Sequence, residues 1–77
     1  MDMAVNSQQV ADRQAIERIV GSYPPERRYT LAIMQDLQKH FNYLPKEALK
    51  MTAVHVKTPL SAVFSMATFY KAFSLVP

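Results

Sequence analysis

The stretch from Phe41 to Phe73, FNYLPKEALKMTAVHVKTPLSAVFSMATFYKAF, decides the fold of this chain. It contains two proline-led helix starts, one at Pro45 and the next at Thr58–Pro59. Proline suits the first turn of a helix, and threonine is a good capping residue before it. In the first run the residues spaced to cover one helical face are Ala48, Leu49, Thr52, Ala53 and Val56. The second run carries the apolar residues Leu60, Val63, Phe64 and Ala67, and its apolar stretch extends to Phe69 and Tyr70.

Upstream of this stretch, apolar residues recur at every fourth position and predict a helix from about Glu26 to Phe41. Their positions are Tyr29, Ile33, Leu37 and Phe41, with Leu31 and Met34 widening the stripe. Pro24–Pro25 should break the chain before this helix. Asn42 should close its end, because asparagine is the second choice after glycine for a left-handed cap.

A first, weakly amphipathic helix is expected from Ser7, as its cap, to about Val20, with Gly21 just past its end. Residues 1–6 should form a loose end. With 77 residues, 49% of them apolar, the chain allows one small domain, 1–77. One glycine and five prolines favour short helices over a sheet, whose hairpins need Gly, Asn or Asp. We therefore predict an all-α bundle of about four short helices.

The residue types that carry out reactions are scarce. The absence of cysteine excludes disulfides, thiolate zinc sites and cysteine-bound iron–sulfur clusters within these residues. His40 and His55 lie on different predicted helices and lack a third metal ligand. Ser61, Ser65 and Thr68 lack an evident base beside them. We predict no catalytic, cofactor-binding or metal-binding residue, and so no active site in the chain by itself.

Charge distribution separates the two halves of the sequence. The net charge is +3, but all six acidic residues lie within the first 47 positions. Residues 53–70 follow the rhythm of a helix-turn-helix, which makes a nucleic-acid-binding module the alternative function. The second helix, however, has no Arg, Lys, Asn or Gln before Lys71, and base and phosphate contacts rely on these residues. We therefore expect no nucleic acid as a partner. A protein-interaction bundle is a third interpretation.

The N-terminal sequence, MDMAVNSQQVADRQ, lacks the apolar core of a signal peptide, and no apolar run is long enough to span a membrane. We expect a cytoplasmic protein that does not insert into a membrane.

One family resemblance is specific. Gln38 is followed by Asn42-Tyr43-Leu44-Pro45-Lys46-Glu47-Ala48, and then by Val63, Ala67-Thr68-Phe69-Tyr70, Phe73 and Pro77. This pattern resembles the N-terminal helical part of the thioredoxin-like [2Fe-2S] subunits of NADH dehydrogenases of the complex I type, NAD(P)-reducing hydrogenases and NAD-dependent formate dehydrogenases. The match covers about residues 30–77. The family usually has glycine where this chain has Asn42.

The resemblance implies an electron-transfer subunit of an NAD(P)-linked oxidoreductase. Its [2Fe-2S] cluster would be held by cysteines of a downstream thioredoxin-like domain, with residues 71–77 as the linker toward it. Flavin and NAD(P) would belong to a partner flavoprotein subunit. This helical piece would then serve assembly and docking to both.

The methionines and aromatic residues are either core or an apolar docking face, since exposed apolar patches mark interfaces. The residues expected at an interface are Tyr43, Leu44, Phe64, Thr68, Phe69, Tyr70 and Phe73. The apolar segment from Phe69 to Val76 is expected to be frayed or exposed in this chain alone.

Overall fold

The computed structural model describes residues 7–70 and 73–76, with side chains from residue 12 onward in the first helix. All regular structure in these residues is helical, which confirms the all-α prediction. The elements are α1 (Ser7–Gly21), the 3-10 helix η1 (Arg27–Tyr29), α2 (Thr30–Phe41), α3 (Lys46–His55) and α4 (Leu60–Phe69). The expected loose end at residues 1–6 lies outside the described residues.

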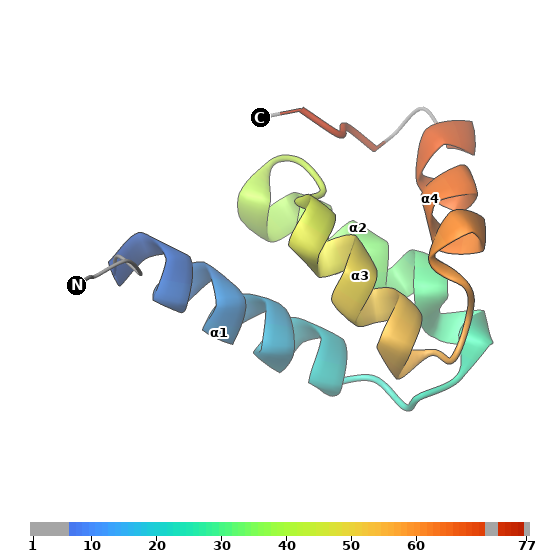
Figure 1. Ribbon diagram of the computed structural model, residues 1–77, viewed down its shortest axis with the longest axis horizontal. Coiled ribbons are helices and arrows are strands. Elements are labelled where there is room, and N and C mark those ends of the chain that lie inside the picture. The colour runs from blue at the N-terminus through green and yellow to red at the C-terminus, as the bar shows by residue number, and fades with distance from the viewer. Residues whose placement is uncertain (1–6, 71–72, 77) are drawn as a thin grey trace.

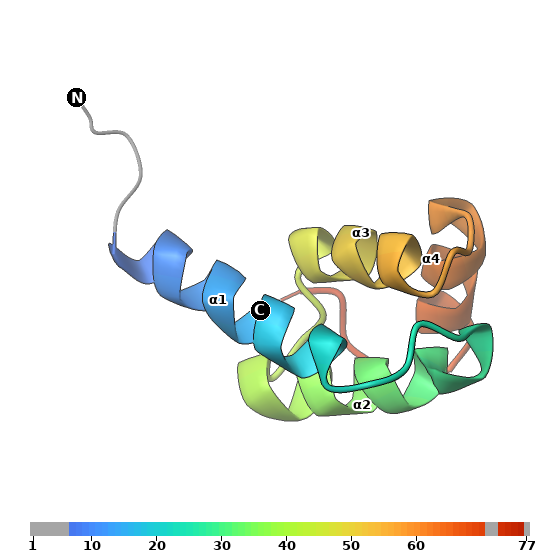
Figure 2. The ribbon, with the colours of Figure 1, turned by 90° about the horizontal axis from the view of Figure 1, so that it is seen from below.

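Helix α3 lies at the centre of the bundle and contacts α1, α2 and α4 (Figure 1). Helices α2 and α3 form two adjacent layers, and the N-terminal turns of α1 extend beyond the rest of the bundle (Figure 2). After α4 the chain runs back toward the turn between α2 and α3 (Figure 1). The buried apolar residues that fill the core are Ile16, Val20, Ile33, Met34, Leu37, Leu44, Ala48, Leu49, Ala53, Val56, Val63 and Ala67.

The predicted helical faces agree closely with the observed core. Ile33, Met34 and Leu37 of α2 are buried, while Tyr29, Leu31 and Phe41 pack at the edge of the core. On the α3 side the five residues expected on one face are all buried: Ala48, Leu49, Thr52, Ala53 and Val56. Three- and four-residue spacing places side chains on the same face of a helix, which explains the agreement.

Three expected helix ends are different in the structure. Gly21 belongs to α1 and is not left-handed. The helix instead ends in bonds to the Ile19 carbonyl, which accepts from the N–H of Ser22 at 3.3 Å and from its hydroxyl at 2.7 Å. Gly21 is therefore the last residue of the helix and not the residue just past its end, and the following serine supplies the closing hydrogen bonds.

The second difference is at the start of α2, which does not continue unbroken from Glu26. Glu26 is extended, and its N–H donates to the Pro24 carbonyl at 2.8 Å. The next three residues form the 3-10 turn η1 before α2 begins at Thr30. The Thr30 hydroxyl donates to the Arg27 carbonyl at 2.6 Å and joins the two elements.

The third difference concerns Thr58, which does not cap α4. Its hydroxyl donates to the Val56 carbonyl at 3.1 Å, back toward α3. Pro59 takes the N-cap position, and its carbonyl accepts from the N–H of Ala62 at 3.0 Å and of Val63 at 3.2 Å. Since Thr58 is itself buried, its hydroxyl bonds inside the turn rather than over the next helix.

Candidate docking surface

Helix α4 presents aromatic side chains to solvent. Val63 and Ala67 are four residues apart and bury the inner face of the helix. The next position after each of them faces outward, so Phe64 is 46% exposed and Thr68 is exposed. Phe69, the last residue of the helix, is 78% exposed. The part of the prediction that counts these aromatics as core is wrong for Phe64 and Phe69.

The exposed rings continue from α4 into the segment that follows. The ring of Phe69 meets that of Tyr70 edge-on, with centroids 5.3 Å apart, and Tyr70 meets Phe73 at 6.4 Å. Edge-to-face pairs at these distances are favourable arrangements of aromatic rings. Tyr70 is exposed and Phe73 packs against the core. We call these three rings, together with Phe64 earlier on α4, the aromatic row; the ring contacts join Phe69, Tyr70 and Phe73.

Two predicted interface residues lie away from this row. Leu44 is 1% exposed and belongs to the core, so its assignment to a docking surface is wrong. It lies two residues after the left-handed Asn42, in the turn between α2 and α3. Tyr43 is half-buried. Of the seven residues expected at an interface, the structure groups Phe64, Thr68, Phe69, Tyr70 and Phe73 on α4 and the segment after it.

The segment after α4 is only partly exposed. Tyr70 and Val76 are exposed, whereas residues 73–75 are half-buried. The N–H of Ser74 donates to the Gln38 side-chain oxygen at 3.0 Å, and its carbonyl accepts from the N–H of Leu44 at 2.7 Å. These bonds contradict the expectation of fraying for residues 73–75. Residues 71 and 72 lie outside the described part of the chain.

Gln38 was not predicted to connect distant parts of the chain. Its Nε2 also donates to the Asn42 carbonyl at 3.2 Å, so one side chain bonds the α2–α3 turn and the C-terminal segment. Asn42 has a φ of 70°, which confirms the predicted left-handed cap, and its N–H donates to the Gln38 carbonyl at 2.7 Å. The signal available in sequence was the spacing of four residues between Gln38 of α2 and Asn42 at its C-cap, which places them one helical turn apart.

The polar residues considered for chemistry are dispersed. The Nε2 of His55 donates to the Tyr23 carbonyl at 2.8 Å, while His40 packs edge-on against Phe41. The Tyr23 hydroxyl donates to Asp36, and this bond, followed by desolvation and the carboxylate charge, raises the pKa of Tyr23. The two contacts of Tyr23 tie the loop after α1 to α2 and α3.

The serine and threonine hydroxyls on α4 form no catalytic arrangement with the residues described. Ser61 and Ser65 are exposed, and the Thr68 hydroxyl donates to the Ser65 carbonyl at 3.0 Å. The face that a recognition helix would turn toward DNA carries Phe64 and these hydroxyls rather than basic groups.

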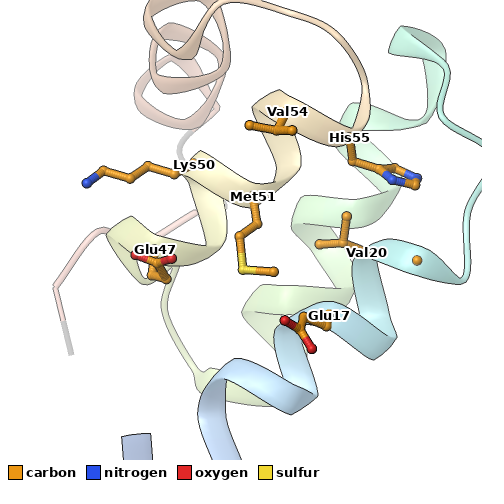
Figure 3. Close-up of a pocket in the computed structure, with 8 residues that line it drawn as sticks. Glu17, Val20, Glu47, Lys50, Met51, Val54 and His55 are labelled. Carbon is orange, nitrogen blue, oxygen red and sulfur yellow. The ribbon is translucent and has the colours of Figure 1, made fainter. Parts of the chain in front are cut away.

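A shallow groove of about 410 Å³ lies between α1 and α3 (Figure 3). Met51 extends from α3 toward α1, where Val20 and Glu17 line the opposite side (Figure 3). Arg13 of α1 pairs with Glu47 of α3 at 3.7 Å and with Glu17 at 3.6 Å. Exposed ion pairs of this kind contribute little to stability, about 0–1 kcal/mol each. The groove has no nucleophile–base pair.

The residues do not fit the cofactor that the resemblance implies. A [2Fe-2S] cluster is held by four thiolates, or by two thiolates and two histidines, and the sequence has no cysteine. In the described residues no three His, Cys, Asp or Glu side chains come together to hold a metal ion. We therefore derive no step through a cluster from these residues. None of the helices in residues 7–70 is both long and apolar enough to cross a bilayer.

Comparison with known proteins identifies the family. The chain is 29% identical over 62 residues to the NADP-reducing hydrogenase subunit HndA of Solidesulfovibrio fructosivorans, covering 80% of this chain and 36% of that protein. It is 28% identical over 58 residues to a subunit of the NADH-quinone oxidoreductase of Aquifex aeolicus (strain VF5), covering 75% and 36%. The chain thus spans about a third of the length of these relatives. Residues 16–77 match the family described as thioredoxin-like [2Fe-2S] ferredoxin, and the chain belongs to that family.

Proposed function

We propose that this chain is the helical N-terminal domain of an electron-transfer [2Fe-2S] subunit in an NAD(P)-linked oxidoreductase of the cytoplasm. The observation that carries the proposal is the aromatic row on a chain that belongs to this family. Large exposed rings on a domain whose described residues form no reactive constellation favour docking over catalysis. The names of both relatives, subunits of a hydrogenase and of a quinone oxidoreductase, support a multi-subunit context.

The proposed partners are a thioredoxin-like [2Fe-2S] domain of the same subunit and the flavoprotein subunit that binds NAD(P). In this role the chain positions the partners that transfer electrons and does not transfer electrons itself. Phe64 and Phe69 are the proposed anchors, since aromatic side chains provide most of the energy at interface centres. Tyr70 and Phe73 would support them from the segment that Gln38 and Leu44 hold in place.

The test is to purify a tagged form of the protein from cells that express it, under native conditions. We expect an NAD(P)-binding flavoprotein and a [2Fe-2S] signal in electron paramagnetic resonance to co-purify. The double variant Phe64→Asp/Phe69→Asp should lose the flavoprotein, because charges in an apolar contact are costly to desolvate. It should keep the cluster signal, because the cluster domain is proposed to belong to the same subunit. Ser61→Asp, an exposed change on the same helix, is the matched control and should retain both.

Two results would overturn the proposal. One is the native protein purifying without a flavoprotein or a cluster signal. The other is co-purification of the flavoprotein in equal amounts with the double variant and with Ser61→Asp, which would show that the aromatic row is not the contact.

A further inference from the structure

The turn between α3 and α4 contains a lysine in a left-handed backbone conformation. Lys57 has a φ of 54°. Its N–H donates to the Val54 carbonyl at 3.2 Å, and the N–H of Thr58 donates to the Ala53 carbonyl at 3.0 Å. This pair of bonds is the Schellman motif, whose left-handed position is usually occupied by glycine and sometimes by asparagine.

Lysine is disfavoured at such a position, because its β-carbon crowds the carbonyl oxygen in the left-handed conformation. The chain uses Asn42, a more tolerant residue type, at its other described non-glycine residue with positive φ. A backbone outlier of this kind, once observed, is grounds for a hypothesis about function. The side chain of Lys57 is therefore the feature to explain.

Lys57 lies beside a shallow groove of about 510 Å³ at the corner between α3 and α4. The apolar residues that line it include Val54, which is 80% exposed, and Leu60, which is 40% exposed. Pro59 and Ala53 also line the apolar part, and Lys50 is the second charged residue. In the close-up of the neighbouring groove, Lys50 extends outward from α3 (Figure 3).

The positive charge of this corner is not neutralised by the described residues. Neither Lys50 nor Lys57 takes part in an ion pair there, whereas Glu47 on the same helix pairs with Arg13 of α1. The groove has no acidic lining residue, and all acidic residues of the sequence lie at or before position 47. Two unpaired ammonium groups beside an exposed apolar floor complement an apolar side chain flanked by carboxylates.

We propose that this groove binds an acidic segment of a partner protein, whose apolar side chain contacts Val54 and Leu60 and whose carboxylates pair with Lys50 and Lys57. The groove lining shares no residue with the aromatic row, and the site is a second docking point beyond the proposed function. Two lysines are too few for the clustered basic surface that nucleic acid requires. The apolar floor between them would also have no role on a phosphate backbone.

The experiment is a nuclear magnetic resonance titration of the ¹⁵N-labelled protein with a synthetic peptide that has one leucine flanked by glutamates. We expect the amide signals of Val54, Lys57 and Leu60 to shift, and the affinity to fall as salt rises. A peptide with glutamine in place of every glutamate should bind more weakly. Phe69→Ala removes a ring of the aromatic row without adding charge beside Leu60 and should leave this binding intact, so that the two docking proposals fail or succeed separately.

Lys57→Gly is expected to have opposite effects on folding stability and on peptide binding. It should raise the urea midpoint, because glycine suits the left-handed position, yet weaken peptide binding roughly two- to fivefold through the lost charge. Lys39→Gln removes one charge from an exposed site on α2 and should leave peptide binding unchanged. Unaltered affinity in Lys57→Gly would overturn the proposal. So would equal binding of both peptides, or shifts at the groove caused only by phosphatidylglycerol vesicles.

Discussion

The N–H of Leu44 donates a 2.7 Å hydrogen bond to the carbonyl of Ser74, joining the α2–α3 turn to the segment that follows α4. Ser74 is bonded on its other side too, since its N–H donates to the Gln38 side chain. The two bonds hold the chain against the bundle in the region where the aromatic row meets it. The position of Ser74 after α4 is thus fixed by Gln38 of α2 and Leu44 of the α2–α3 turn.

Gln38→Leu should detach this segment while leaving the core in place. The substitution removes the acceptor of the Ser74 N–H and the donor to the Asn42 carbonyl, at a cost of about 1–3 kcal/mol. Amide hydrogen exchange at Ser74 should become faster than in the native protein. Gln35→Leu, an exposed change on the same helix, is the control and should not alter it. Unchanged protection of Ser74 in Gln38→Leu would show that Leu44 alone holds the segment.

Asn42→Ala should destabilise the protein by about 1 kcal/mol, because alanine is disfavoured at the φ of 70° found there. Asn42→Gly should be neutral or stabilising, since glycine adopts this conformation without steric cost. The free energy of unfolding in urea distinguishes the pair. Equal destabilisation by both substitutions would assign the effect to the asparagine side chain and not to the backbone conformation.

Local periodicity was sufficient to predict much of the bundle. The stripes of α2 and α3 follow from three- and four-residue spacing, and the Asn42 cap follows from residue type. These features depend only on neighbouring residues. The shift of Thr58 away from capping and the left-handed Lys57 were not predictable in this way, because both depend on how the turn is packed.

The candidate docking surface was predictable only in outline. The sequence shows that α4 is apolar nearly all round, which leaves open which of its side chains face the core. The packing of α4 against the bundle buries Val63 and Ala67 and leaves Phe64 and Phe69 exposed. The bond between Gln38 and Ser74 joins residues far apart in sequence, so no local pattern indicates it.

Leu44→Ala should cost about 2–5 kcal/mol of folding free energy, the range for leucine truncation in a packed core. Phe69→Ala should change stability by less than about 0.5 kcal/mol, since the side chain is mostly exposed. Urea unfolding of both variants tests whether Leu44 is a core residue and Phe69 a surface residue. Comparable losses in the two variants would mean that Phe69 supports the fold as well.

Stability should decline more steeply above about pH 10 in the native protein than in Tyr23→Phe. The hydrogen bond to Asp36, then burial and the carboxylate charge, raises the pKa of Tyr23 above its usual value of about 10. Above that pH the unfolded chain loses the phenol proton while the folded chain still retains it, so deprotonation favours unfolding. The stabilising contribution is complete below about pH 10 and is lost as the pH rises through the pKa of the folded state.

Urea unfolding between about pH 8 and pH 11 measures this difference, with pH values chosen to bracket the ordinary tyrosine pKa of about 10. Tyr43→Phe is the matched control, because the Tyr43 hydroxyl makes no hydrogen bond with the described residues. The free energy of unfolding of Tyr43→Phe should decline with pH as that of the native protein does. Parallel profiles of stability against pH for the native protein and Tyr23→Phe would show that Tyr23 has the same pKa in the folded and unfolded chains. The bond to Asp36 would then make no pH-dependent contribution to stability.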